Sequence, residues 1–161
     1  MRFFEFNSEI TLKFEGAYIL NEEIIRTENI TFRTLSPILL EYDVDGKKEP
    51  LLPLNNSEFT EFNKHFTAVH HRILRDIRTE NNKKGPGLYK ELEFFPLKIR
   101  KKVVKHTLHG FRELTGKPYM MLTCFEGCFD LKGDPRDLQM FYQIGIGLRT
   151  GQGFGMVEVV G

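Results

Sequence analysis

One long amphipathic segment constrains the fold more than any other part of this sequence. From about Glu58 to Arg78, apolar side chains recur every three or four positions, which is the spacing of one face of an α-helix. The stripe consists of Phe59, Phe62, Phe66, Val69, Ile73 and Ile77. Asn55, Asn56 or Ser57 can cap the start of this helix, and the sequence TENNKKGPG ends it.

Segments typical of β-strands lie on both sides of this helix. They cover residues 30–42, 92–107, 117–131 and 155–160, with the turn-prone LHGFRELTG between the middle two. Pro37 indicates an edge position or a bulge in the first strand. Asp134 followed by Pro135 indicates the start of a second, shorter helix. The resulting order, βαββαβ, predicts an α+β, ferredoxin-like (RRM-related) fold.

The length and composition of the chain fit one packed domain with some additional material. The chain has 161 residues, of which 40% are hydrophobic, and its 15 phenylalanines with no tryptophan predict a core of Phe rings. Ile10, Leu12 and Phe14 alternate with polar residues as in a half-buried strand. We therefore expect residues 30–161 to form the ferredoxin-like domain and residues 1–29 to be a partial strand segment.

The two cysteines, Cys124 and Cys128, give only a weak metal signal. A tetrahedral site needs four ligands, and no second Cys or His pair stands at a matching spacing. Two packed, reduced thiols on one strand face are the better interpretation, and we predict no metal and no cofactor. No apolar run approaches the roughly 20 residues of a membrane span, and the N-terminus lacks a signal peptide's apolar core. The sequence thus predicts a cytoplasmic protein without membrane contact.

Five glycines lie within the eleven residues that precede the last strand. They are Gly145, Gly147, Gly151, Gly153 and Gly155. A dinucleotide-binding motif has its strand before the glycines and its helix after them, which is the reverse of the order here, and no Walker Gly-Lys-Ser/Thr is present. A helix C-cap and turn would need only one or two of the glycines. We interpret the run as a backbone platform for phosphates, with Arg149 as clamp and Thr150 and Gln152 as added donors.

A basic stretch, residues 97–112, supports this interpretation. The formal net charge of the chain is only +1, so a nucleic acid would have to meet a local patch. Lys98, Arg100 and Lys102 alternate on one strand face, which we extend to Lys105. A charge-protected edge strand is the alternative. Beside the glycine run we favour a positive groove lined by Lys98, Arg100, Lys101, Lys102 and Lys105.

The segment GIGLRTGQGFG before a final strand resembles the glycine-rich loop of the CRISPR repeat-RNA-processing endoribonucleases, the sixth family of Cas proteins. TFRTLSPILL, followed by a proline-containing loop and a long helix, is similar to the middle of those proteins. The resemblance implies two ferredoxin-like domains, a glycine-rich loop that helps to hold RNA, and one metal-independent cut in the repeat of precursor CRISPR RNA. It implies repeat RNA as the partner, with other Cas proteins or a second copy of the chain as further partners.

The sequence departs from that family in its length. In many members the general acid–base histidine comes from the first domain, and residues 1–29 contain no histidine. We expect residues 1–29 to be the remnant of that first domain. Either the chain is a piece of a longer protein, or it is a shortened protein that binds RNA without cutting, or its chemistry lies elsewhere.

Metal-free RNA cleavage needs a general base, a general acid and cationic stabilisation, and the sequence assigns no catalytic residue. The candidate histidines are His65, His70, His71, His106 and His109. The helix pattern predicts that His71 points away from the core, that His70 lies on the flank and that His65 lies near the buried face. His106 and His109 adjoin the basic stretch. An alternative function is a ferredoxin-like protein-interaction subunit of a ribonucleoprotein complex without nuclease activity.

Overall fold

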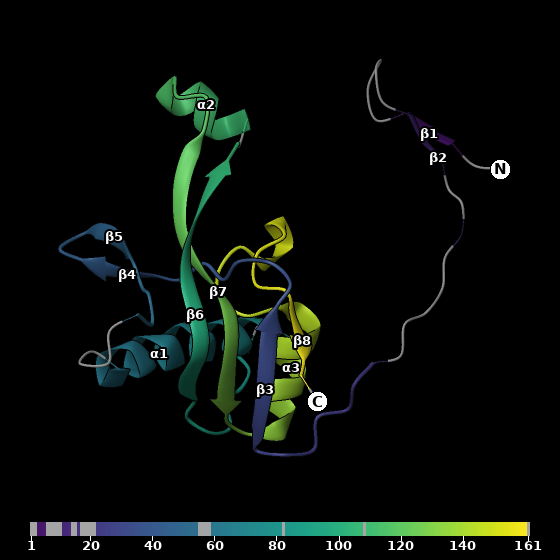
Figure 1. Ribbon diagram of the computed structural model, residues 1–161, viewed down its shortest axis with the longest axis vertical. Helices are drawn as coiled ribbons and strands as arrows, with labels where there is room; N and C mark the ends of the chain where they lie inside the picture. The colour runs from purple at the N-terminus through teal and green to yellow at the C-terminus, as the bar shows by residue number, and fades with distance from the viewer. Residues whose placement is uncertain are drawn as a thin grey trace.

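A four-stranded antiparallel sheet forms the centre of the protein in a computed structural model that describes residues 3–5, 11–13, 16, 22–54, 59–81, 83–107 and 109–160 (Figure 1). Its strands are β3 (Asn29–Thr34), β6 (Glu93–His106), β7 (Met120–Lys132) and β8 (Val157–Val159). They lie in the order β6-β7-β3-β8. Two separate hairpins are formed by β1 (Phe3–Glu5) with β2 (Thr11–Lys13) and by β4 (Glu41–Val44) with β5 (Lys47–Pro50).

The two longer helices, α1 (Phe59–Ile77) and α3 (Pro135–Ile144), lie on the same face of the sheet, behind it in Figure 1. On the opposite face, which we call the open face, the segments around Leu39 and Phe154 cover only the part near Leu122 and Cys124. Along the chain, the domain runs β3-α1-β6-β7-α3-β8. Across the sheet, the last strand β8 lies beside the first strand β3, followed by β7 and β6, and this order defines the ferredoxin-like arrangement. The predicted fold class is therefore confirmed. None of the described helices is long and apolar enough to cross a membrane.

Phenylalanine rings fill the space between the helices and the sheet. Phe94 of β6 stacks on Phe129 of β7 with ring centroids 4.5 Å apart, and Phe62 of α1 contacts Phe94 at 5.1 Å. The predicted Phe core is confirmed. The buried line of α1 differs from the predicted stripe, because it runs through Phe62, Phe66, His70 and Leu74, while Ile77 is 49% exposed. The prediction that His70 lies on the flank was wrong.

Residues 30–42 do not form one strand. β3 ends at Thr34, and the chain rejoins β7 only at Ile38, which pairs with Phe125. Around Pro37 the backbone leaves the ladder, and the Pro37 carbonyl oxygen accepts a hydrogen bond from the N–H of Gly155, so the strand pairing is interrupted there. The turn-prone LHGFRELTG contains a short helix, α2 (His109–Thr115), at the far end of the β6–β7 hairpin.

Some expectations concern residues outside the described ranges. These are the capping residues 55–57, and Ile10 and Phe14 of the N-terminal strand pattern. Nearer to β3, Ile25 is buried and donates its N–H to Gln139 Oε1 of α3 at 2.7 Å. The segment just before β3 therefore packs on the domain, and the division into residues 1–29 and 30–161 stays a prediction.

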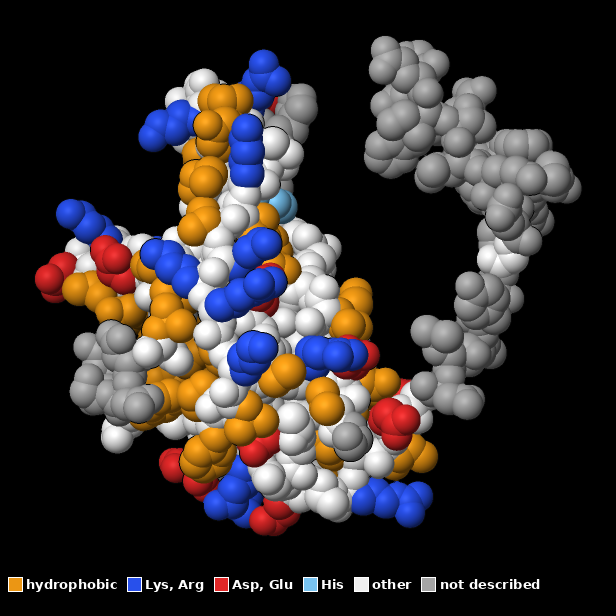
Figure 2. Space-filling model, in the orientation of Figure 1, with side chains coloured by type: hydrophobic (Ala, Val, Ile, Leu, Met, Phe, Trp, Pro, Cys, Tyr) orange, Lys and Arg blue, Asp and Glu red, His pale blue; other side chains and the backbone are white. Residues whose placement is uncertain are grey.

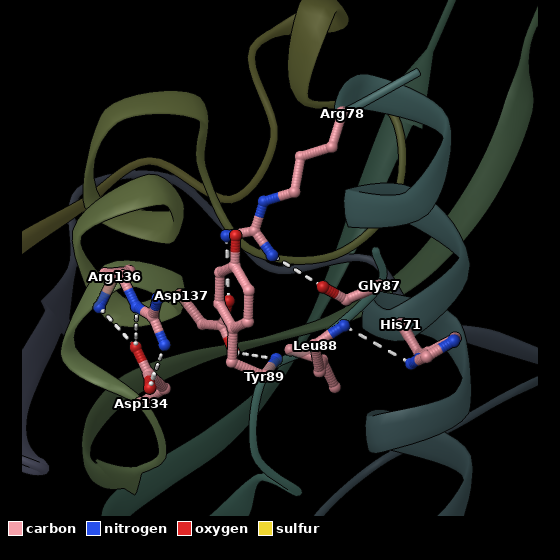
Figure 3. Close-up of polar contacts among 8 residues, drawn as sticks. All are labelled: His71, Arg78, Gly87, Leu88, Tyr89, Asp134, Arg136 and Asp137. Atoms are coloured by element: carbon pink, nitrogen blue, oxygen red, sulfur yellow. Dashed lines mark hydrogen bonds and ion pairs between the residues drawn. The ribbon is translucent and has the colours of Figure 1, made fainter. Parts of the chain in front are cut away.

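A buried ion pair joins the end of α1 to the start of α3 (Figure 3). Arg78 Nη2 lies 2.8 Å from Asp137 Oδ1, and the N–H of Tyr89 donates to Asp137 Oδ2 at 2.8 Å. The side chain of Asp137 has no solvent exposure. The Tyr89 ring lies under two guanidinium groups, Arg78 at 4.4 Å and Arg136 at 3.7 Å. These contacts fix α3, and with it the start of the loop that follows.

Candidate nucleic-acid interface

The glycine-rich loop, residues 145–156, connects α3 to β8 and is packed tightly at its base. A Cβ atom on Gly155 (φ +73°) would collide with the carbonyl oxygen of Ile146. A Cβ atom on Gly147 (φ +91°) would lie 2.6 Å from the carbonyl oxygen of Leu39. Only glycine combines this backbone conformation with such close approach. The fold itself thus requires these two glycines.

Most N–H groups at the base of the loop are already hydrogen-bonded within the protein. The bonds run from Ile146 to Gly155 O, from Gly147 to His70 Nε2, from Leu148 to Leu39 O and from Gly155 to Pro37 O. Within the described residues, no hydrogen bond engages the N–H groups of residues 149–151. We therefore confine the predicted anion platform to the tip of the loop, residues 149–151.

The tip of the loop has the backbone form of an anion-binding nest. Arg149 is left-handed, with φ 59° and ψ 32°, and the next residues, Thr150–Gln152, form a 3₁₀ turn. Alternation of left- and right-handed residues turns consecutive N–H groups toward one side. A Cβ atom on Gly151 would have no heavy atom within 4 Å, so space is open there. The predicted donors Arg149, Thr150 and Gln152 are thus brought together at this tip.

The tip lies against the end of β6. His106 Nε2 is 3.2 Å from Gln152 Oε1, and Arg149 Nη1 donates to the same oxygen at 3.3 Å. The His106 ring stands edge-on to the buried ring of Phe154, with centroids 5.5 Å apart. Phe154 packs with Leu39, Leu122 and Cys124 in a small apolar cluster beneath the loop. The loop tip and the end of β6 therefore form one surface.

Cationic side chains cross the open face of the sheet toward this surface. Arg33 on β3 pairs with Cys128 on β7, and Cys128 pairs with Lys98 on β6, so the three stand in one row. Arg100 and Lys102 follow Lys98 on the same face of β6. We call Arg33, Lys98, Arg100 and Lys102 the cation track. Figure 2 shows Lys and Arg side chains gathered over β6 and β7 on this face.

Two carboxylates accompany the cation track. Glu126 Oε1 lies 2.6 Å from Arg100 Nη2 and 4.0 Å from Lys102 Nζ, and Glu158 pairs with Arg33. The four cations of the track therefore outnumber the two carboxylates that pair with them. The side chain of Arg100 is 78% exposed and open to solvent.

The structure places Lys101 and Lys105 on the opposite face of β6, so the extension of the basic strand face to Lys105 was wrong. Lys101 stands opposite Phe125 and Lys105 opposite Met121, whereas Lys102 stands opposite Cys124. Strand side chains alternate, and residues an odd number apart point to different faces. Lys105 Nζ instead lies 3.9 Å above the ring centroid of Tyr119.

A hollow of about 540 Å³ opens in the cation track where β3 leaves β7. Its lining includes Arg33, Lys98 and Arg100, together with Ser36. At its floor the N–H of Gly127 donates to Thr34 Oγ1 at 2.9 Å, replacing the interrupted strand pairing. Arg33 was not among the predicted site residues, although its alternation with the buried Phe32 indicates an outward position.

The two cysteines have free thiols in different surroundings. Cys124 is buried beneath the loop, and burial raises the pKa of its thiol to about 11. Cys128 is half-buried in the hollow of the cation track. Over the part of the chain that the structure describes, no group of three or more His, Cys, Asp or Glu residues could hold a metal ion.

The histidines of α1 lie away from the cation track. His65 Nε2 contacts Glu61 Oε1 at 2.9 Å, and the exposed His71 accepts the N–H of Leu88 at 3.3 Å (Figure 3). His70 is fully buried beneath the base of the loop. The side chain of His109 lies outside the described part of the structure. Among the described histidines, His106 alone reaches the loop tip.

Comparisons with a family model and with solved structures point to the same protein family. The model of the C-terminal part of the CRISPR-associated protein Cas6 matches residues 20–159. A solved structure of a CRISPR-associated protein Cas6 has a TM-score of 0.63 and 26% identity, covering 87% of this chain and 52% of that one. A comparison with curated proteins gives no significant match.

Two further solved structures share the fold at 19% identity. One is a Cas6-related protein from Pyrococcus furiosus, with a TM-score of 0.57 over 88% of this chain and 51% of that one. The other is described as an RAMP protein binding different RNA substrates, with a TM-score of 0.59 over 89% and 52%. The chain spans about half the length of these solved structures. With its family model matched over residues 20–159 of 161, the chain belongs to the Cas6 family of CRISPR-associated proteins and corresponds to the C-terminal part of that family.

Proposed function

We propose that this chain binds the repeat RNA of precursor CRISPR transcripts, using the cation track and the tip of the glycine-rich loop. One observation carries the proposal: the tip, with Arg149 and three unengaged amides, lies on the same side of β6 as the cation track. A structural neighbour of this chain is described as binding RNA substrates. The proposal places the protein in the cytoplasm, as the sequence predicts.

The geometry suits an extended phosphate chain rather than a single small anion. Lys98 and His106 are eight residues apart on β6, which corresponds to roughly 26 Å along a strand. An RNA backbone that follows β6 would meet the guanidinium and ammonium groups first and the loop amides at the end. Arg149 can then hold a phosphate bidentately.

The carboxylates beside the cation track are compatible with phosphate binding. Exposed ion pairs such as Arg100–Glu126 contribute only about 0–1 kcal/mol, so an arginine can exchange a carboxylate for a phosphate at low cost.

We further propose that the protein takes part in cutting the repeat, as membership of its family implies. His106 brings an imidazole to the loop tip, where it can give or take a proton. The solved relatives are about twice as long as this chain, so a complete cleavage site belongs to the proposal and His106 is its first test.

The proposal is tested by titrating repeat RNA with the protein in EDTA, with samples resolved on native and denaturing gels. We expect a shifted complex with the wild type and a clear loss of binding in Arg149→Ala. Lys101→Ala, which removes a lysine from the opposite face of β6, is the control. A specific cut on the denaturing gel that is lost in His106→Ala would support processing. Wild-type protein that leaves the RNA unshifted would overturn the binding proposal.

A second candidate function, docking of another protein, has one observation in its favour. The far end of the β6–β7 hairpin exposes apolar side chains, with Val103 at 45%, Met121 at 59% and Leu114 at 89%. Another Cas protein or a second copy of the chain could cover them. Binding at such an apolar surface would persist at high salt, whereas phosphate binding would not.

A further inference from the structure

A buried imidazole connects α1 to the base of the glycine-rich loop. His70 has no solvent exposure, and its ring contacts Phe66 at 4.1 Å and Phe141 at 4.9 Å between centroids. His70 Nδ1 lies 2.7 Å from the carbonyl oxygen of Phe66. The N–H of Gly147 donates to His70 Nε2 at 3.0 Å. Both ring nitrogens are therefore engaged.

The two partners define one tautomer of the ring. A carbonyl oxygen only accepts hydrogen bonds, so Nδ1 must carry the proton that points to Phe66. An N–H only donates, so Nε2 must offer its lone pair to Gly147. Burial lowers the pKa of His70 to about 4, which keeps the ring neutral and this lone pair available near neutral pH.

Gly147 is the point from which the loop tip departs. Its φ of +91° and its closeness to the Leu39 carbonyl leave it little freedom. The next residue, Leu148, donates its N–H to Leu39 at 2.8 Å, and the residue after that is Arg149. The hydrogen bond between Gly147 and His70 therefore lies two residues before Arg149, the residue that we propose to bind phosphate.

We propose that His70 is a positioning residue for RNA binding: its neutral imidazole, in one tautomer, holds Gly147 and thereby sets the conformation of the loop tip that meets phosphate. The inference rests on the proposed RNA-binding function. It assigns His70 a role that a hydrophobic residue of similar size could not fill, because the buried N–H of Gly147 needs an acceptor.

The hydrogen bond to Gly147 distinguishes a positioning role of His70 from simple packing in the core. Phe66 and Phe141 enclose the ring, and a phenylalanine at position 70 would keep those contacts. Burying a polar ring among them is unfavourable unless its nitrogens are hydrogen-bonded. What phenylalanine cannot supply is the acceptor for Gly147.

The test compares His70→Phe with His70→Gln in the full chain. Glutamine can turn its amide oxygen toward Gly147, whereas phenylalanine has no acceptor. We expect His70→Phe to bind repeat RNA about tenfold more weakly, as expected for a buried donor left without its partner, and His70→Gln to recover most of that loss. Folded fractions are measured by thermal unfolding, and affinities are compared at a temperature where each variant is folded. Equal affinity of His70→Phe and the wild type would overturn the inference.

A second measurement addresses the bond itself and covers the case in which His70→Phe does not fold. In the wild-type protein labelled with ¹⁵N, we expect a coupling across the hydrogen bond between the amide nitrogen of Gly147 and Nε2 of His70. In His70→Gln the amides of residues 149–151 should keep their wild-type shifts. Absence of the coupling, or large shifts at these amides in His70→Gln together with unchanged RNA affinity, would also overturn the inference.

The two proposals fail in different ways. Wild-type protein that does not bind RNA would overturn the RNA-binding function, and with it the role of His70 in binding. RNA binding that is lost in Arg149→Ala but unchanged in His70→Phe would leave the function standing and remove the positioning role alone.

Discussion

At the scale of single residues, the buried imidazole of His70 couples stability to pH. Its pKa is lowered from 6.5 to about 4 by burial, so between these values the unfolded chain binds a proton that the folded protein does not. Stability therefore rises with pH in this window and is lost as pH falls. Between pH 7.5 and pH 5 the expected loss is about 2 kcal/mol.

Urea unfolding at several pH values checks this prediction. Between pH 7.5 and pH 5, the free energy of unfolding of His70→Gln should fall by about 2 kcal/mol less than that of the wild type. An unchanged slope in His70→Gln would contradict the buried, neutral state of the ring.

The glycines of the loop divide into those the fold needs and those it does not. Gly155→Ala would force a Cβ atom into the Ile146 carbonyl at a positive φ, so we expect destabilisation by at least about 2 kcal/mol. Gly151→Ala meets open space and should change the free energy of unfolding by less than about 1 kcal/mol. Thermal unfolding of both variants measures the difference. Equal stability of the two would contradict the packing described for the loop.

Substitution of asparagine for Asp137, in α3, and for Asp134, the residue that caps α3, separates the loss of a buried charge from the loss of an exposed one. Asp137→Asn leaves Arg78 without its charged partner in a buried site, and we expect a loss of about 3–5 kcal/mol. Asp134 caps α3 by accepting the N–H of Arg136 and also pairs with the exposed guanidinium of Arg136. Asparagine keeps the cap and loses only this surface ion pair, so Asp134→Asn should cost about 0–1 kcal/mol. Denaturant unfolding compares the two. A cost for Asp134→Asn as large as that for Asp137→Asn would contradict the assignment.

At the scale of secondary-structure elements, the two faces of β6 make opposite predictions. Lys98 belongs to the cation track, and Lys101 points to the other face. Lys98→Ala should weaken RNA binding several-fold through the loss of one phosphate contact, while Lys101→Ala should not. Fluorescence anisotropy with labelled repeat RNA resolves the difference. Equal losses in both variants would place the RNA elsewhere.

The positions of several helices and strands could be predicted from patterns of neighbouring residues. The spacing of Phe62 and Phe66 located α1, and the Asp134–Pro135 pair located the start of α3. The glycine-rich run was placed correctly between helix and strand. The alternation of Lys98, Arg100 and Lys102 also put these three side chains on one face of β6.

Features that depend on distant partners could not be predicted in the same way. The buried His70 accepts a hydrogen bond from Gly147, which lies 77 residues further along the chain. Arg33 joins the cation track only through the pairing of β3 with β7. The interruption of the strand at Pro37 likewise follows from its contact with Gly155. Packing, rather than local propensity, decides all of these.

At the scale of the whole molecule, a basic surface lies on a nearly neutral chain. The net charge is +1, yet the cation track and Arg149 bring five cations to one side of the sheet and its loop. If a nucleic acid binds this surface, its counterions are released and the affinity falls as salt rises, whereas binding at an apolar interface lacks this dependence. The central claim therefore concerns how affinity depends on salt.

The most direct measurement is the dependence of the repeat-RNA dissociation constant on salt concentration, for the wild type and for Arg149→Ala. If the five cations each meet a phosphate of single-stranded RNA, the logarithm of the association constant should fall with the logarithm of salt at a slope of about −3.5. Arg149→Ala should reduce the steepness by about 0.7. A slope near zero, or the same slope in both proteins, would contradict the assignment of this surface to RNA.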